Sequence, residues 1–316
     1  MLAAINANGT KAALAARNAG VETNFPHDNA TRPLSGLQTH SKDAGPSPLA
    51  QAVQNDNLVR VKALLDQDAT DVNGLVRSLK DRDSPEEPIP LLAAAAEAGN
   101  REICQALVAH GADVNLGGSR CALKMAAMRG RSEVIRFLFQ HGATLDPPDG
   151  ISDDYSLMQA ARSGDDASVR LLLTHGADAK YVGRWGSVLS DAVLGGNLAV
   201  IKRVVEAGAD VNGGGAYTNV LQDAAEAGNV EIVRYLLKKG AEVNGEFRWN
   251  RTPLLEAVKA GHTAVVKLLL EHGADWRPQE EAGGMGFTQG DTAFRLAQRT
   301  GNKEIVQMLR KAGAKE

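Results

Sequence analysis

The 316-residue sequence has few of the residues that build disulfide frameworks or membrane spans. Its two cysteines, Cys104 and Cys121, cannot form such a framework, and this sparse use fits a reducing compartment. No apolar run approaches the roughly 18 residues that cross a bilayer, so we expect no membrane partner. The net charge is −3 and no basic stripe occurs, which argues against direct binding of nucleic acid.

Recognisable catalytic motifs are missing as well. There is no HExxH, no Gly-x-Ser-x-Gly and no set of kinase motifs. The glycine runs at 213–215 and 283–286 neither follow a strand nor end in Gly-Lys-Ser/Thr, so they indicate loops rather than phosphate sites. The acidic pairs at 153–154 and 165–166 flank helix starts, where carboxylates favour the helix dipole. We therefore expect no enzyme activity, no cofactor and no metal.

The chain instead repeats itself. Segments similar to "GADVN" recur at 110–115, 141–146, 175–180, 207–212, 239–244 and 272–277, and a second glycine stands twelve residues before the glycine of each. The same spacing separates Gly301 from Gly313, and Asp56 and Asp68 occupy the two slots at the start of the array. The register therefore predicts eight units.

Within a unit, the segment between the two glycines has helical periodicity. In "NVEIVRYLLKKG" (229–240), Ile232, Val233, Leu236 and Leu237 fall on one face, and Gly240 supplies a left-handed residue that ends the helix. A second short helix, "VLQDAAEAG" (220–228), precedes the first glycine. Each unit is therefore predicted to be helix, turn, helix and then a projecting loop, here called a finger.

A period near 33 residues with this order resembles the ankyrin repeat. The motif is clearest at Thr252-Pro253-Leu254, with Ala257, Gly261-His262 and Gly273-Ala274-Asp275 following. The resemblance implies an all-α solenoid of helix-turn-helix units with hairpin-like fingers. Other units read "SVLSDA" and "NVLQDA", as in a variant common in fungal arrays. None keeps the histidine that usually follows the leucine, which puts the usual side-chain cap of the first helix in doubt.

The predicted array covers residues 46–316, with units starting near 47, 90, 121, 155, 187, 219, 252 and 292. Residues 1–45 are interpreted as a disordered or weakly helical tail, with a targeting presequence as the alternative. The long connections at 74–89 and 276–291 are rich in glycine, proline or charge, and we interpret both as extended fingers on the binding side.

Histidine and cysteine could suggest metal or thiol chemistry, but the repeat explains their positions better. His110, His141, His175 and His272 share one slot in different units, so copies about 8–10 Å apart cannot share a metal. We predict a turn role before the glycine that ends the helix. Cys104 and Cys121 are predicted to be small buried residues.

The resemblance implies binding through the fingers and the concave face, which the first helix of each unit lines. Positions just before the first glycine carry Arg129, Arg162, Lys259 and Arg299. The fingers carry aromatics at a regular spacing: Trp185, Tyr217 and Trp249, each 32 residues from the next. Tyr155, Tyr181, Phe247, Trp276 and Phe287 also lie on or at fingers.

Aromatics and arginines dominate binding hot spots, so we predict a binding surface of the finger aromatics and nearby cations. Its residues are Trp185, Tyr217, Trp249, Arg184, Arg248, Arg251, Arg129, Arg162 and Lys259. We expect it to take a protein segment with acidic and apolar residues. The alternative is that the aromatics only pack one finger on the next.

We predict that the protein is a monomeric, non-catalytic scaffold in the cytoplasm or nucleus, with a protein partner. The alternative is a transcriptional co-regulator or inhibitor that binds a transcription factor. An enzyme would need a cluster of perturbed titratable groups, which the sequence does not show. A ubiquitin-ligase adaptor would need an accessory motif that we do not find.

Overall fold

The computed structural model describes residues 46–67, 70–76, 88–145, 155–183, 186–214, 219–245, 251–277 and 292–314. These residues form eight consecutive helix pairs, which we call units. The first helix of each pair, the inner helix, is α2 (Pro48–Gln54), α4 (Leu91–Ala98), α6 (Ala122–Met128), α8 (Ser156–Ser163), α10 (Val188–Gly195), α12 (Val220–Ala227), α14 (Pro253–Ala260) or α16 (Ala293–Thr300).

The second helix of each pair is the outer helix. The outer helices are α3 (Leu58–Leu65), α5 (Arg101–Ala109), α7 (Ser132–Gln140), α9 (Asp166–Thr174), α11 (Leu198–Glu206), α13 (Val230–Lys238), α15 (Thr263–Glu271) and α17 (Lys303–Lys311). One short 3-10 helix, η1 (Gly118–Arg120), precedes α6. The strands β1 (Leu75–Val76) and β2 (Ile89–Pro90) pair antiparallel, so the two ends of the predicted 74–89 finger lie together.

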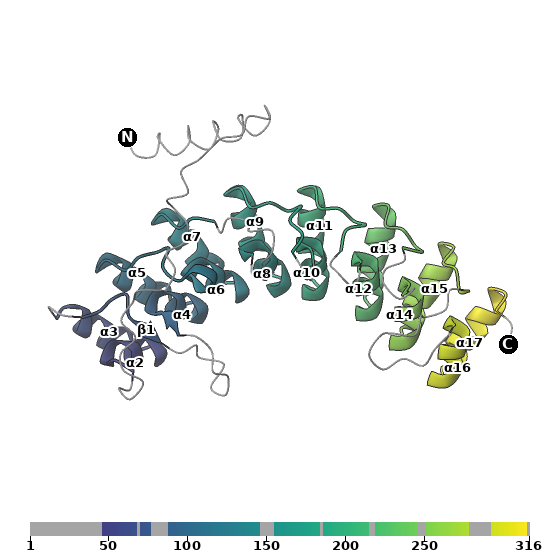
Figure 1. Cartoon of the computed structure of the whole chain (residues 1–316), viewed down its shortest axis with the longest axis horizontal. Coiled ribbons are helices and arrows are strands. Elements are labelled where there is room, and N and C mark those ends of the chain that lie inside the picture. The colour runs from purple at the N-terminus through teal and green to yellow at the C-terminus, as the bar shows by residue number, and fades with distance from the viewer. Residues whose placement is uncertain are drawn as a thin grey trace, which may run out of the picture.

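The units stack in chain order into an arch (Figure 1). The inner helices line its concave side and the outer helices its convex side, as Figure 1 shows from α8 and α9 through α14 and α15. Inner helices pack against the inner helices of neighbouring units, and outer helices do the same more loosely. An array built this way derives its stability from contacts between neighbours, because one helix pair cannot bury its own apolar face.

Left-handed glycines end the helices, at Gly240 as the sequence predicted and at Gly228 as well. Gly228 has φ 76° and Gly240 has φ 94°, and both follow the last residues of helices in the sixth unit. Asp56, in the glycine slot of the first unit, has φ 55° and is the one non-glycine residue with positive φ among those described. The backbone geometry of the repeat is therefore kept where the glycine is lost.

The core runs along the interface between the two helix layers. In α13, Ile232, Val233 and Leu236 are buried and Leu237 packs against them, as the helical periodicity predicted. Alanines fill the positions where inner helices approach one another, and α4 buries four of them in succession, at positions 93–96. Small side chains at these positions let the inner helices come close, which brings their polar residues within reach of the next unit.

Asparagines at the start of several fingers link neighbouring units by hydrogen bonds. Asn115 accepts a hydrogen bond from the backbone N–H of Thr144 (2.9 Å) and donates one to the carbonyl of Gly142 (3.0 Å), both in the next unit. Asn212 and Asn244 make the same pair of bonds. Because each asparagine satisfies backbone groups of its neighbour, it fixes the position of one finger base relative to the next.

The joint between the fourth and fifth units has Lys180 in this asparagine slot. Two arginine–aspartate pairs cross the joint in opposite directions. On the outer side, Arg203 of α11 holds Asp166 of α9 through two bonds of 2.6 and 2.7 Å. This contact lowers the pKa of the Asp166 carboxyl. The inner pair, Arg162 and Asp191, belongs to the candidate site.

The histidines and cysteines have the structural roles predicted for them. The ring nitrogen Nδ1 of His110, His141, His175 and His272 lies 2.8 Å from the carbonyl oxygen four residues earlier, at the end of an outer helix. Cys104 and Cys121 are both buried. Burial raises the pKa of the Cys104 thiol to about 12, so it stays protonated at neutral pH.

Candidate functional site

The concave face carries arginines that lie over buried carboxylates of neighbouring inner helices. Arg162, near the end of α8, donates two hydrogen bonds to one oxygen of Asp191 on α10, at 2.9 and 2.5 Å. Arg129, directly after α6, contacts Glu97 on α4 in the same way, at 3.1 and 2.7 Å. Each pair joins two neighbouring units.

The two members of each pair differ in exposure. The side chain of Arg162 is 59% exposed while that of Asp191 is 4% exposed. For Arg129 and Glu97 the values are 28% and 4%. A formally neutral pair therefore presents its cation to solvent and keeps its carboxylate beneath. The pairing also fixes the guanidinium in place, so little side-chain entropy remains to be lost when a partner binds.

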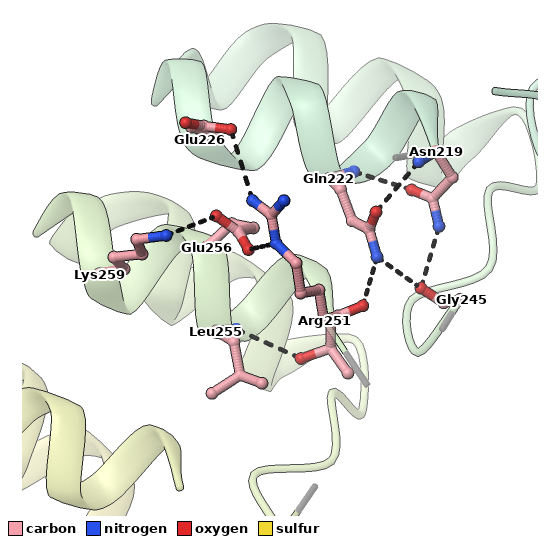
Figure 2. A network of polar contacts seen from close by, with 9 residues as sticks. Asn219, Gln222, Glu226, Gly245, Arg251, Leu255, Glu256 and Lys259 are labelled. Carbon is pink, nitrogen blue, oxygen red and sulfur yellow. Dashed lines mark hydrogen bonds and ion pairs between the residues drawn. The ribbon is translucent and has the colours of Figure 1, made fainter. Parts of the chain in front are cut away.

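A larger network of the same kind joins the sixth and seventh units (Figure 2). Arg251, just before α14, donates from Nε to Glu256 (2.5 Å), and its Nη2 lies 3.9 Å from Glu226 of α12. Lys259 Nζ lies 4.0 Å from the second oxygen of Glu256. Glu256 is again the buried member, with 2% of its side chain exposed, whereas Lys259 exposes 36%.

Gln222 of α12 connects this network to the finger that ends at Arg251. Its Nε2 donates to the carbonyls of Arg251 and Gly245, which are the residues on either side of the 246–250 segment (Figure 2). Its Oε1 accepts from the N–H of Asn219, whose own side chain accepts from the N–H of Gln222. This reciprocal capping box means that Gln222 caps α12 in the slot from which the usual histidine is missing.

The inner helices also expose side chains beyond these pairs. Leu194 on α10 is 55% exposed, and Val59 and Val182 are the other large apolar residues that are exposed in the described part of the chain. Glu226 on α12 exposes 59% of its side chain, and Arg299 on α16 is exposed. All of these except the two valines occupy the slot two residues before the first glycine of the unit.

The structure describes part of the predicted binding surface. Trp185, Tyr217, Trp249, Arg184 and Arg248 lie outside the described residues, so the choice between partner contact and packing stays open for them. Arg129, Arg162, Arg251 and Lys259 lie on the inner helices or next to them. These four cations hold carboxylates of the chain itself, a role that the sequence reasoning did not foresee.

The described aromatics at the fingers make internal contacts. The Trp276 indole N–H donates to the carbonyl of Ala312 in the next unit (3.0 Å). Tyr155 and Tyr181 are buried with ring centroids 4.8 Å apart, and the Tyr155 hydroxyl accepts from the N–H of Asp178 (2.7 Å). For these three residues the packing role is the one that the structure supports.

The acidic pair at 165–166 also has a structural role. Asp165 caps α9 by accepting from the N–H of Ser168 (2.8 Å), as predicted, while Asp166 holds Arg203 instead of acting as a cap. Among the described residues no group of three or more His, Cys, Asp or Glu side chains could hold a metal ion. Within the same ranges no helix is both long and apolar enough to cross a membrane.

The comparisons with known proteins identify the family. A profile for ankyrin repeats matches three times, at residues 49–149, 157–246 and 244–316. The chain belongs to the ankyrin-repeat family. Ankyrin repeats are general protein–protein interaction modules, and typically they carry no catalysis. A comparison with curated proteins finds no match.

A solved structure shows the same fold. The ankyrin repeat domain of human ASB11 matches with a TM-score of 0.63 and 23% identity, over 73% of this chain and 99% of that one. At this identity the match supports the all-α ankyrin solenoid and nothing about partners.

Proposed function

We propose that this ankyrin protein is a non-catalytic scaffold that binds a partner protein through its concave face and fingers. The observation that carries the proposal is the arrangement of the inner pairs, which turn Arg162, Arg129 and Lys259 toward solvent and leave their carboxylates beneath. Such a surface suits a partner segment that supplies acidic side chains. Leu194, at the equivalent position of the unit after that of Arg162, adds exposed apolar area.

The proposal extends to features that the sequence alone supports. The eight helix pairs are taken as eight ankyrin repeats, and Trp185, Tyr217 and Trp249 are taken as partner contacts in the fingers, supported by Arg184 and Arg248. The surface would act in the cytoplasm or nucleus of the cell. Aromatic anchors of this kind bury much area at small entropic cost.

The test compares capture of partners by the full chain and by three variants. Trp185→Ala/Trp249→Ala removes two finger aromatics, and Leu194→Asn removes the exposed apolar contact of the concave face. Val59→Asn is the matched control, because Val59 is 80% exposed but lies on an outer helix.

We expect the first two variants to lose the partners that the unchanged chain captures and the control to keep them, with melting temperatures unchanged in all three. The proposal is wrong if the control alone loses the partners. Loss of the fold in the double tryptophan variant would instead assign those residues to packing between fingers, and Leu194→Asn would still test the concave face.

A further inference from the structure

In five consecutive units, the residue two positions before the first glycine of the unit is exposed. From the fourth unit to the eighth, this slot carries Arg162, Leu194, Glu226, Lys259 and Arg299, which we call the concave row. In the second unit the same slot holds Glu97, which is buried. The concave row therefore presents an ordered pattern of cation, apolar residue, anion, cation and cation.

Three members of the row are held by neighbouring residues. Arg162 is fixed by Asp191, and Lys259 lies over Glu256. Glu226 is 3.9 Å from Arg251, and its own backbone carbonyl lies 2.9 Å from Nε2 of His262 in the next unit. Because the side chains start from defined positions, their order along the arch can be read by a rigid partner.

The spacing of the row restricts the conformation of that partner. Packed helices lie about 8–10 Å apart, so neighbouring side chains of the row are separated by about that distance. A polyproline II segment rises about 3.1 Å per residue with three residues per turn, so every third side chain points the same way at about 9.3 Å intervals. In a β-strand, by contrast, the side chain three positions along points to the opposite face.

An α-helix matches the row less well. In an α-helix, the side chain seven positions along returns to the same face after about 10.5 Å. This distance exceeds the spacing of the inner helices, and the mismatch adds up over the four intervals of the row. A polyproline II segment needs about 13 residues to reach all five positions.

We propose that the concave row binds an extended polyproline II segment whose every third residue reads acidic, apolar, basic, acidic, acidic. This inference rests on the proposed function and adds the conformation of the partner and the order of its side chains. The acidic residues meet Arg162, Lys259 and Arg299, the apolar residue meets Leu194 and the basic residue meets Glu226.

A synthetic peptide pair tests the order without knowledge of the natural partner. The matched peptide is a 13-residue, proline-rich sequence with Asp, Leu, Lys, Asp and Asp at positions 1, 4, 7, 10 and 13. The permuted peptide exchanges the Leu and Lys and keeps composition and net charge. Both are measured by fluorescence anisotropy against the full chain and against the double variant Leu194→Glu/Glu226→Leu, which exchanges the same two neighbours in the protein.

We expect the unchanged chain to prefer the matched peptide by about tenfold, and the double variant to prefer the permuted peptide by a similar factor, because two contacts are mismatched at once. The exchange leaves protein composition and charge unchanged, so general electrostatic attraction cannot produce the reversal. A third peptide with the same residues every seventh position on an alanine-based helix should bind more weakly than the matched peptide.

Equal affinity for the matched and permuted peptides would overturn the inference, as would tighter binding of the helical peptide or no binding of any peptide. None of these results affects the capture experiment of the proposed function, which depends on natural partners. Loss of captured partners with Val59→Asn alone would contradict the proposed function, whatever the peptides show.

Discussion

Gly195 is where a single methyl group should test the close approach of two inner helices. It is the last residue of α10, and a Cβ atom at this position would lie 2.5 Å from the carbonyl oxygen of Ala161 and 2.8 Å from that of Arg162, both on α8. Both contacts are to backbone, so no side-chain rotation can relieve them. In Gly195→Ala, α10 must therefore move away from α8.

Two effects of opposite sign decide the outcome. In a helix, alanine is more favourable than glycine by up to about 1 kcal/mol. Forcing a methyl group against a packed backbone costs about 1–3 kcal/mol. The second effect is larger here, so we expect Gly195→Ala to lower the free energy of unfolding by about 1 kcal/mol. For a domain of this size that lowers the melting temperature by about 2–4 °C.

Ala227 provides the control, because it occupies the same slot at the end of α12 in the next unit and is exposed. There the methyl group is accommodated, so Ala227→Gly should destabilise by the propensity term alone, up to about 1 kcal/mol. Glycine is thus the better residue at one position and alanine at the other. Thermal and urea unfolding of the two variants measure this. A higher melting temperature for Gly195→Ala than for the unchanged chain would refute the close approach.

Three further predictions concern single polar groups. Asp166→Asn should lower stability by up to about 1 kcal/mol at neutral pH, the usual limit for a surface pair. Because Arg203 lowers the pKa of Asp166 in the folded state, this stabilisation is present above the usual pKa range of carboxyl groups and is lost as the pH falls below it. Urea unfolding of both proteins between pH 7 and pH 2 should therefore show that their difference in stability vanishes. A difference that persists at the lowest pH would contradict the pairing of Asp166 with Arg203. Tyr235→Phe should leave the melting temperature unchanged or raise it, because the Tyr235 hydroxyl is buried without a hydrogen-bond partner in the described part of the chain; a clear fall would point to a bond at that hydroxyl. Gln222→Ala should destabilise by about 2 kcal/mol in chemical unfolding, because it removes a capping bond and the two bonds that join Gly245 to Arg251, whereas an unchanged midpoint would mean that these bonds contribute nothing.

Much of the fold follows from local patterns in the sequence. Residues such as Ile232 and Gly240 repeat at spacings that specify a helix face and a helix end, and the structure confirms both. The turn role of the repeated histidines is confirmed as well, since the ring nitrogen of each lies near the carbonyl oxygen four residues earlier in its own helix. These predictions succeeded because each depends on interactions within a few residues of chain.

The candidate site was only partly predictable. The cations Arg129 and Arg162 could be placed on the concave face by their slot, but nothing in their spacing named the carboxylates beneath them. A signal was present: the slot five residues before the first glycine is acidic in three consecutive units, at Asp191, Asp223 and Glu256. Using that signal would have required knowing that Asp191 and Glu256 are buried between helices, which only the packing shows.

The stack of helix pairs is encoded locally, because the repeat period, the helix faces and the left-handed turns each depend on a few neighbouring residues. Which charged residues pair with one another depends on how the units pack. Arg162 and Asp191 are brought together by the packing of α8 on α10. Gln222 bonds to Gly245 and Arg251 because both of these residues lie next to α12. In these pairs the carboxylates are buried and the cations are exposed, because the short acidic side chains lie between the helices while the longer arginine and lysine side chains reach solvent.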